Sequence, residues 1–292
     1  MNYLKALEHA IIYIEDHLTE PFSVVEAARY AGYSYYHLTR QFSAVLGESI
    51  GSYVRKRRLA NAAKDLIYSD ERILDIALKW GFESSEAFSR AFKSLYMMNP
   101  AAYRRNRLDL FIGKKPMLDE ERLSHLAENL TVQPVLTTLP DIKVAGLRGQ
   151  TTLRDNVLPG LWAEFNSISH KIPDAIPGGR GFGICEACSE GNTLLNMNED
   201  VNFSEIAGIE VSSLEHIKPP FTGKILKGGR YAVFTHKGSL SRLSETFEYI
   251  WGTWFLSAQE ELDFREDFEL YDERFLGYDH PESRIDLYIP VK

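Results

Sequence analysis

The chain has 292 residues, of which 44% are hydrophobic and 25% are charged, and its formal net charge is -8. This length favours two domains, and this composition excludes a largely disordered protein. No apolar run reaches the ~20 residues of a membrane-spanning helix, and MNYLKALEHA lacks the basic start and apolar stretch of a signal peptide. We therefore expect a cytoplasmic protein without a membrane partner.

An apolar stripe predicts a helix at the start of the chain, and two copies of one unit follow it. The stripe consists of Leu4, Leu7, Ile11, Ile14 and Leu18. The second copy lies 50 positions after the first, so that Arg40 pairs with Arg90, Phe42 with Phe92, Tyr53 with Tyr103 and Arg55 with Arg105.

Each copy has the helix start and stop signals of a helix-turn-helix. A short helix ends at a glycine, Gly32 or Gly81, and a second helix begins after a serine N-cap, Ser34 or Ser84. In the second copy, Phe88, Ala91, Phe92 and Leu95 recur at the spacing of one buried helix face. The pattern predicts two helix-turn-helix units in series.

The segment between the copies is rich in helix formers and contains no proline. Roughly 20 helical residues at ~1.5 Å each span ~30 Å. This length is close to the ~34 Å between successive major-groove faces on one side of DNA. The alternative is a helical bundle whose outer faces are only solvated. The duplication and the spacing together favour DNA.

Charge is distributed unevenly along the chain. Residues 1–108 carry 15 basic and 12 acidic side chains, whereas the remainder carries 18 and 29. The basic residues of the front part gather in RKRR (55–58) and RRNR (104–107), and each run follows one of the duplicated helices. This pattern predicts that contact with nucleic acid is confined to the front part.

Four segments in this region resemble the DNA-binding domain of the AraC/XylS transcription regulators, most nearly the branch that contains MarA, SoxS and Rob. They are GYSYYHLTRQF, RKRRLANAAKDL, ILDIALKWGFESSEAFSRAFK and NPAAYRR. The resemblance implies a domain over residues 1–108, double-stranded DNA and RNA polymerase as partners, and base contacts from the early turns of two recognition helices. By position these contacts fall on Tyr36, Thr39 and Arg40 in the first helix and on Ser85, Glu86, Ala87 and Arg90 in the second.

The basic side chains fall into two expected roles. Arg40 and Arg90 suit bidentate contacts to guanine, the commonest specific pairing in the major groove. Glu86 is expected to accept a hydrogen bond from cytosine N4 or to repel phosphate. Because Arg90 is the main reader of its helix, we expect less discrimination at the second half-site. The residues expected to position the DNA backbone are Arg57, Arg58, Arg104 and Arg105.

The sequence pattern of the back half changes from helices to a mixture of strands and helices. Residues 109–129 are interpreted as a linker with some helix, and residues 130–292 as an α+β domain of two β-α-β-β repeats with helices on one face of one sheet. The expected strands are 142–150, 181–188, 203–212, 229–238, 267–275 and 283–292, and the expected helices are 156–172 and 240–258. In the last strands, alternation groups Glu269 and Tyr271 with Asp286 and Tyr288, and taken alone it favours a solvated face.

Several segments here resemble GyrI-like small-molecule-binding domains, which include the sensors of multidrug-responsive regulators. They are GGRYAVFTHKG, YIWGTWF, FELYDERF and DLYIPVK. The resemblance implies a carboxylate at Glu269 in an aromatic pocket lined by Trp162, Tyr271 and Trp254. The expected effector is a small molecule that is cationic or amphipathic.

The sequence is also compatible with two other functions. Some GyrI-like relatives hydrolyse small molecules, and Glu269 with Tyr271 or Tyr231 has the residue types for acid/base chemistry. A regulator without a small effector is the third possibility. We expect no enzyme, because fusion to a DNA-binding domain makes signal reception the simpler role.

No cofactor or metal is expected. CEAC (185–188) is a single CxxC without a second pair to complete a zinc site, and no P-loop, GxSxG or HExxH occurs.

Overall fold

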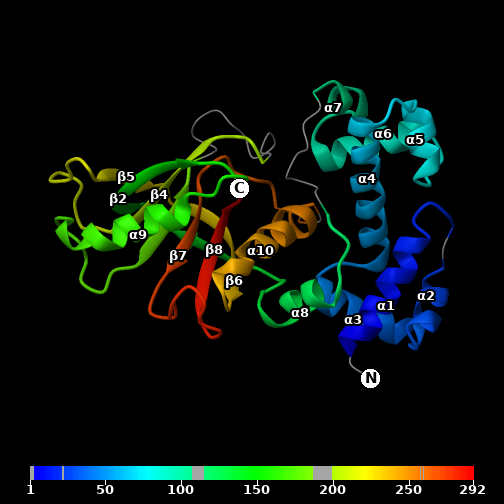
Figure 1. The fold of residues 1–292 in the computed structure, drawn as a ribbon, viewed down its shortest axis with the longest axis horizontal. Coiled ribbons are helices and arrows are strands. Elements are labelled where there is room, and N and C mark those ends of the chain that lie inside the picture. The colour runs from blue at the N-terminus through cyan, green and yellow to red at the C-terminus, as the bar shows by residue number, and fades with distance from the viewer. Residues whose placement is uncertain (1–2, 22, 107–114, 187–198, 257, 259) are drawn as a thin grey trace. The chain divides into compact units, whose positions relative to one another are not determined.

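The computed structural model describes residues 3–21, 23–106, 115–186, 199–256, 258 and 260–292, and these form two compact units (Figure 1). Unit 1 comprises Met1–Val132 and Ser244–Ala258, and unit 2 comprises Gln133–Leu243 and Gln259–Lys292. These bounds differ from the expected ones, because part of the expected linker is a helix of unit 1. The segment Ser244–Ala258 also joins unit 1, although it follows a strand of the second β-α-β-β repeat.

Unit 1 is helical, and its fourth helix connects the two helix-turn-helix units. In Figure 1, α1 to α3 lie at one end of α4, and α5 to α7 lie at the other. None of the helices described combines the length and the apolar composition that crossing a bilayer requires. The helices are α1 Tyr3–Asp16, α2 Val24–Tyr30, α3 Tyr35–Leu46, α4 Ile50–Tyr68, α5 Ile73–Lys79, α6 Ser85–Tyr96, α7 Pro100–Asn106 and α8 Glu120–Glu128.

The two turns are built in the same way. Gly32 and Gly81 have φ of 73° and 71°, a left-handed conformation that favours glycine. The amide of the next residue bonds back to the helix in each copy, Tyr33 N to Ala28 O at 2.8 Å and Phe82 N to Ala77 O at 2.9 Å. This is the hydrogen bond of a Schellman motif.

The second helix of each helix-turn-helix, α3 or α6, is called a reading helix, and each begins after its predicted serine N-cap. Ser34 Oγ accepts from His37 N at 3.3 Å, and Ser84 Oγ accepts from Ala87 N at 3.1 Å. The serine hydroxyls therefore satisfy an amide that no helical carbonyl reaches. The duplicated helix-turn-helix is confirmed down to its caps.

The predicted apolar stripes form the core of unit 1. All five residues of the first stripe and all four of the second are buried. Phe92 packs against Phe88, Tyr96 and Tyr103 with ring centroids 4.4–5.4 Å apart. The exposed sides of the same helices are thereby left for other contacts.

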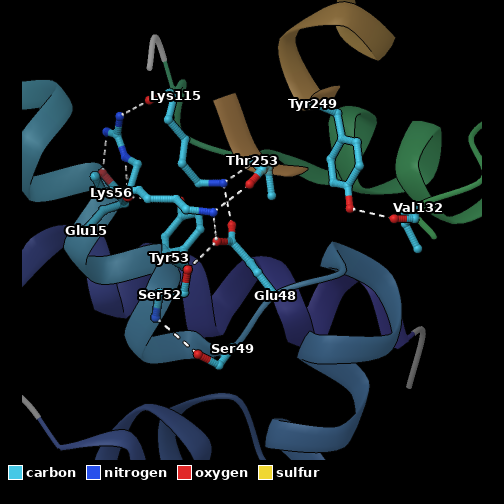
Figure 2. A network of polar contacts seen from close by, with 11 residues as sticks. Glu15, Glu48, Ser49, Ser52, Tyr53, Lys56, Lys115, Val132, Tyr249 and Thr253 are labelled. Carbon is cyan, nitrogen blue, oxygen red and sulfur yellow. Dashed lines mark hydrogen bonds and ion pairs between the residues drawn. The ribbon is translucent and has the colours of Figure 1, made fainter. Parts of the chain in front are cut away.

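A buried ion cluster joins three distant segments of unit 1 (Figure 2). Lys56 Nζ lies 2.9 Å from Glu48 Oε2 and donates to the carbonyl of Thr253 at 2.7 Å. Lys115 Nζ pairs with Glu48 Oε1 and donates to Thr253 Oγ1 at 2.6 Å. The four residues are 4–6% exposed.

One carboxylate therefore serves two buried ammonium groups. Burial opposes the charge of Glu48, but Lys115 and Lys56 outweigh it and lower its pKa. Burial lowers the pKa of Lys115 to about 8. The cluster is stable only while all of its parts stay together.

A second contact holds the returning segment against the end of the first reading helix. Tyr249 lies at the end of α10 (Leu243–Tyr249), and a π-helical turn over Ile250–Trp254 continues this helix. The Tyr249 hydroxyl donates to Val132 O at 3.0 Å. It also occupies the space where a side chain at Gly47, the C-cap of α3, would lie.

In the described part of unit 2, eight strands form an antiparallel sheet in the order β1-β6-β8-β7-β3-β4-β2-β5. The predicted β-α-β-β repeat is confirmed, and each copy gains one further strand at its start, β1 or β5. The elements are β1 Val135–Leu139, β2 Ile142–Thr151, α9 Leu158–Ile168, β3 Gly181–Cys185, β4 Phe203–Glu210, β5 Thr222–Leu226, β6 Gly229–Lys237, β7 Asp267–Tyr271 and β8 Arg284–Pro290.

The register of β7 and β8 corrects the grouping expected from alternation. Phe268 lies opposite Tyr288 and Leu270 opposite Asp286, whereas Glu269 lies opposite Leu287. Directly opposed residues in an antiparallel pair project to the same face. Glu269 and Asp286 are therefore on different faces, because the strands pair one residue away from the register that the polar pattern suggested.

The ion cluster gives a first prediction. Replacing Glu48 with glutamine leaves two buried ammonium groups without a countercharge, so we expect a loss of about 3–5 kcal/mol in the free energy of unfolding of unit 1. Urea denaturation followed by far-UV circular dichroism measures the loss. Arg72→Ala, which removes an exposed pair with Asp75, is the control and should not move the transition. An equally small effect of both variants would show that the cluster is not a source of stability.

Candidate DNA interface and effector site

The first reading helix presents its predicted residues on one exposed side. Tyr36 is 78% exposed, Arg40 is exposed and Thr39 is partly exposed. The Thr39 hydroxyl donates to Tyr35 O at 2.8 Å, so it is engaged with its own helix. Tyr36 and Arg40 are thus the side chains of this helix that are most available to DNA.

The second reading helix differs by carrying an acid in its first turn. Ser85 and Ala87 are partly exposed, while Glu86 and Arg90 are exposed. Hydrogen bonds from its own backbone N–H and from Ser84 and Ser85 lower the pKa of Glu86, and the charge of Arg90 adds to this. The position of Glu86 is therefore explained by the positive end of the helix, without a base contact.

Arg40 and Arg90 are available for recognition. Among the residues that the structure describes, neither guanidinium forms an ion pair. A free, exposed guanidinium on a reading helix has the geometry for bidentate readout of guanine.

Arg57 does not fit the predicted role at the DNA backbone. It is 8% exposed, and its guanidinium pairs with Glu15 through Nε at 2.7 Å and through Nη2 at 2.6 Å. Nη1 donates to Lys115 O at 2.5 Å. The arginine is occupied inside unit 1, and sequence alone gave no sign of Glu15 as its partner.

Arg58 and Arg104 also bond to backbone carbonyls of their own unit. Arg58 donates to Leu18 O at 2.7 Å and Glu20 O at 3.0 Å, and its guanidinium lies against Gly81 at the second turn. Arg104 donates to Leu66 O at 3.2 Å and to Glu71 O at 2.7 Å. Both tie together parts of the duplicated domain, so their predicted phosphate contacts lose support.

Two arginines at matching positions are exposed instead. Arg105 was expected to position the backbone, and it is exposed on α7. Arg55 is exposed on α4 and was not among the expected contacts, although the 50-residue repeat pairs it with Arg105. The repeat was therefore a better guide to surface arginines than the basic runs.

In unit 2, the site predicted around Glu269 lies over a glycine of the central strand. Gly183 on β3 is directly opposite Glu269 on β7. A Cβ at Gly183 would lie 3.0 Å from Glu269 Oε2, 3.3 Å from Glu205 Oε1 and 3.5 Å from Trp162 Cζ2. Three side chains from β7, β4 and α9 thus meet where β3 has none.

Aromatic rings surround the carboxylate. The rings of Trp162 and Tyr271 are 4.9 Å apart, and those of Tyr271 and Phe275 are 5.0 Å apart. The Tyr271 hydroxyl donates to Glu269 Oε2 at 2.5 Å. The structure therefore brings together Glu269, Trp162 and Tyr271, three of the four predicted ligand residues.

Burial changes the protonation of the acids on this face. It raises the pKa of Glu269 to about 7, although the Tyr271 hydroxyl favours the charged form. It also raises the pKa of Asp267 to about 6. Burial, followed by the charges of Glu269 and Asp267, holds the pKa of Glu205 well above its ordinary range. Perturbed carboxyl groups beside aromatic rings are typical of binding sites.

Other predicted features lie elsewhere. Trp254 belongs to the segment grouped with unit 1, and its predicted role in ligand binding stays a prediction. Cys185 lies on the same face as Glu205 and Asp267, opposite both, while Cys188 is outside the described residues. Within the described ranges, no set of three or more His, Cys, Asp or Glu side chains has an arrangement that could hold a metal ion.

Comparison with known proteins identifies both parts. A family described as integron-associated effector binding protein matches residues 135–291, and a helix-turn-helix domain family matches residues 27–106. The uncharacterized HTH-type transcriptional regulator YbfP of Bacillus subtilis is 49% identical over 104 residues, which are 36% of this chain and 35% of that protein. The transcriptional regulator Rob of Salmonella typhimurium is 28% identical over 261 residues, which are 87% of this chain and 85% of Rob.

The structure of SAV2435 bound to tetraphenylphosphonium is similar to 55% of this chain and 94% of that protein, at 14% identity and a TM-score of 0.43. The family match spans more than half of the sequence, and the helix-turn-helix match precedes it. The chain therefore belongs to the integron-associated effector binding proteins, and it joins this GyrI-like domain to a DNA-binding domain of the AraC/XylS transcription regulators.

Proposed function

We propose that the protein regulates transcription in response to a small, cationic and partly apolar molecule that binds over Gly183. The observation that carries the proposal is Glu269, a partly buried carboxylate with a raised pKa, held by a tyrosine beside a tryptophan ring. An aromatic face attracts a cation through its quadrupole, and a carboxylate in a partly dry site adds a full charge. DNA is read by α3 and α6, and RNA polymerase is the partner of the bound regulator.

The chain path offers a route from this site to the DNA-binding unit. The segment Ser244–Ala258 packs against the end of α3, and the chain then reaches β7, which begins at Asp267 and carries Glu269. Thr253 of the ion cluster and Glu269 of the proposed site are thus connected along the chain. We infer that this segment carries the signal.

The DNA-binding part of the proposal predicts two different mutant phenotypes. Arg90→Ala should cost about 1–3 kcal/mol at one preferred base, because it removes a bidentate contact. Arg105→Ala should weaken all sequences alike and lower the salt slope by about 1, as expected for a phosphate contact. Selection of bound sequences from random DNA at several salt concentrations distinguishes the two.

Lys171→Ala is the control for loss of one positive charge, because Lys171 is exposed in unit 2. A uniform loss for Arg90→Ala would assign this residue to phosphate. If wild-type protein enriched no sequence at moderate salt, the regulator proposal itself would fail.

The effector part predicts that Glu269→Gln weakens binding of tetraphenylphosphonium about tenfold, or ~1.4 kcal/mol, because the probe loses its countercharge. Titration calorimetry measures the affinity. Glu164→Gln, an exposed acid on α9, serves as the control and should bind as wild type does. Unchanged affinity of Glu269→Gln would contradict the electrostatic account. Mass spectrometry of recovered ester or epoxide probes tests the hydrolase alternative, which would gain support from a product.

The proposed route predicts that Thr253→Val separates sensing from DNA binding. The variant keeps the shape of the side chain but removes the hydroxyl that accepts from Lys115. We expect tetraphenylphosphonium and DNA each to bind nearly as in wild type, while the effect of the probe on DNA affinity falls. Fluorescence anisotropy with labelled operator DNA measures this coupling, which is typically 1–3 kcal/mol in such systems, an order-of-magnitude guide. An undiminished response would place the route elsewhere.

A further inference from the structure

The acidic side chains on the two faces of the unit 2 sheet differ in their ion pairing. On the face of Asp286, carboxylates pair with basic side chains: Arg274 with Asp286 at 2.6 Å and Arg180 with Glu210 at 3.0 Å. On the face of Glu269, neither Glu269, Glu205 nor Asp267 forms an ion pair within the part of the chain that the structure describes. Negative charge on this face therefore lacks a cation from the protein.

Glu205 is the most isolated of these acids. It is 6% exposed, and its carboxyl group makes no hydrogen bond and no ion pair with the described residues. Its opposite neighbours on the flanking strands are Gly149 and Cys185. A buried carboxyl group without a partner is costly, and such a group is retained where it has a ligand or a proton to hold.

The space between Glu205 and Glu269 is created by a missing side chain. A single Cβ at Gly183 would approach an oxygen of each acid, at 3.3 Å and 3.0 Å. The two carboxyl groups belong to strands on either side of β3, and only a glycine at this position lets them converge.

Asp267 is a further buried acid on this face. It is 7% exposed, and its Oδ1 has no hydrogen-bond partner among the described residues. It lies opposite Cys185 on the strand that carries Glu269, in one row with Glu205. A buried oxygen without a hydrogen bond thus lies on the same face as two acids that form no ion pair among the described residues, and a cationic occupant would suit this arrangement.

We propose that Glu205 and Glu269 form one cation-binding subsite over Gly183, and that the pair exchanges bound protons for the positive charge of the effector. This inference rests on the proposed function, and it adds Glu205 as a specificity-determining residue. Glu269 is partly exposed, so an arriving cation meets it first. Glu205 supplies a second negative charge behind it.

The exchange balances charge without a covalent step. In the empty site, protons on the pair suppress repulsion between two carboxylates. When a permanent cation arrives, a proton leaves to solvent and the cation takes its place. The raised pKa values of Glu269, about 7, and of Glu205 agree with this order of events. The other titratable groups facing the pair are Asp267, Cys185 and Tyr271, with Tyr278 near Tyr271.

The sign of the pH dependence follows from this exchange. At low pH the cation must displace protons, whereas at high pH the carboxylates are already charged. Affinity for a permanent cation therefore rises with pH, by about tenfold per pH unit for each proton released. A neutral ligand would bind with no such rise.

Titration calorimetry with tetraphenylphosphonium, in buffers of different ionisation enthalpy, counts the protons released by the full chain. For wild type near neutral pH we expect about one proton per cation bound. For Glu205→Gln we expect fewer protons and an affinity that stops rising at a lower pH, because one acid of the pair is gone. An unchanged proton count and pH profile in Glu205→Gln would overturn the proposal.

A second variant tests the geometry. Gly183→Ala places a methyl group between the two acids, so we expect loss of tetraphenylphosphonium binding in a folded protein. Gly160→Ala on α9, where an added Cβ meets nothing within 4 Å, is the control. Unchanged binding by Gly183→Ala would contradict the subsite.

The outcomes separate this inference from the proposed function. If Glu269→Gln loses affinity while Glu205→Gln and Gly183→Ala behave as wild type, the sensor stands and the acid pair is rejected. If wild-type protein binds no lipophilic cation, the proposed function fails as well.

Discussion

A single buried carboxylate, Glu48, forms ion pairs with two buried ammonium groups, and the packing of unit 1 depends on this arrangement. Charge taken out of water is costly unless it is paired and hydrogen-bonded. The segments that carry Lys56, Lys115 and Thr253 are far apart in sequence, and separating them would leave buried charges unpaired. The carboxylate directly follows the C-cap of α3. The same interaction thus lies at the end of α3 and contacts Thr253 in a segment from the back of the chain.

Both halves of the protein are duplications whose two copies share the same secondary structure but differ in their exposed or polar side chains. The helix-turn-helix copies share serine caps and glycine turns, but one reading helix presents Tyr36 and the other Glu86. In the sheet, β3 and β7 occupy corresponding places in the two repeats, yet only β7 carries acids on the face of α9. The residues proposed to bind DNA and effector therefore lie where the copies differ, and the caps and turns lie where they agree.

Local signals made the helices and most strands predictable. Caps, turns and apolar stripes act within a few residues, so they can be read from sequence. Long-range pairing could not be read in this way. The partner of Arg57 is 42 positions away, and the face of Asp286 depends on the register of β8 against β7. Glu205 was missed because nothing near it in sequence marks it. Its place beside Gly183 depends on the pairing of β3 with β4.

The edge strands of the sheet are exchanged between repeats: β1 pairs with β6 of the second repeat, and β5 pairs with β2 of the first. Two separate copies of one repeat would close the same sheet as a symmetric dimer with swapped strands. In that ancestor-like arrangement, the central residues of β3 and β7 would be identical and would face each other across the axis. Here those residues are Gly183 and Glu269. Two identical copies cannot place an acid opposite a glycine at this position. A fused chain can, because its two halves can differ in sequence.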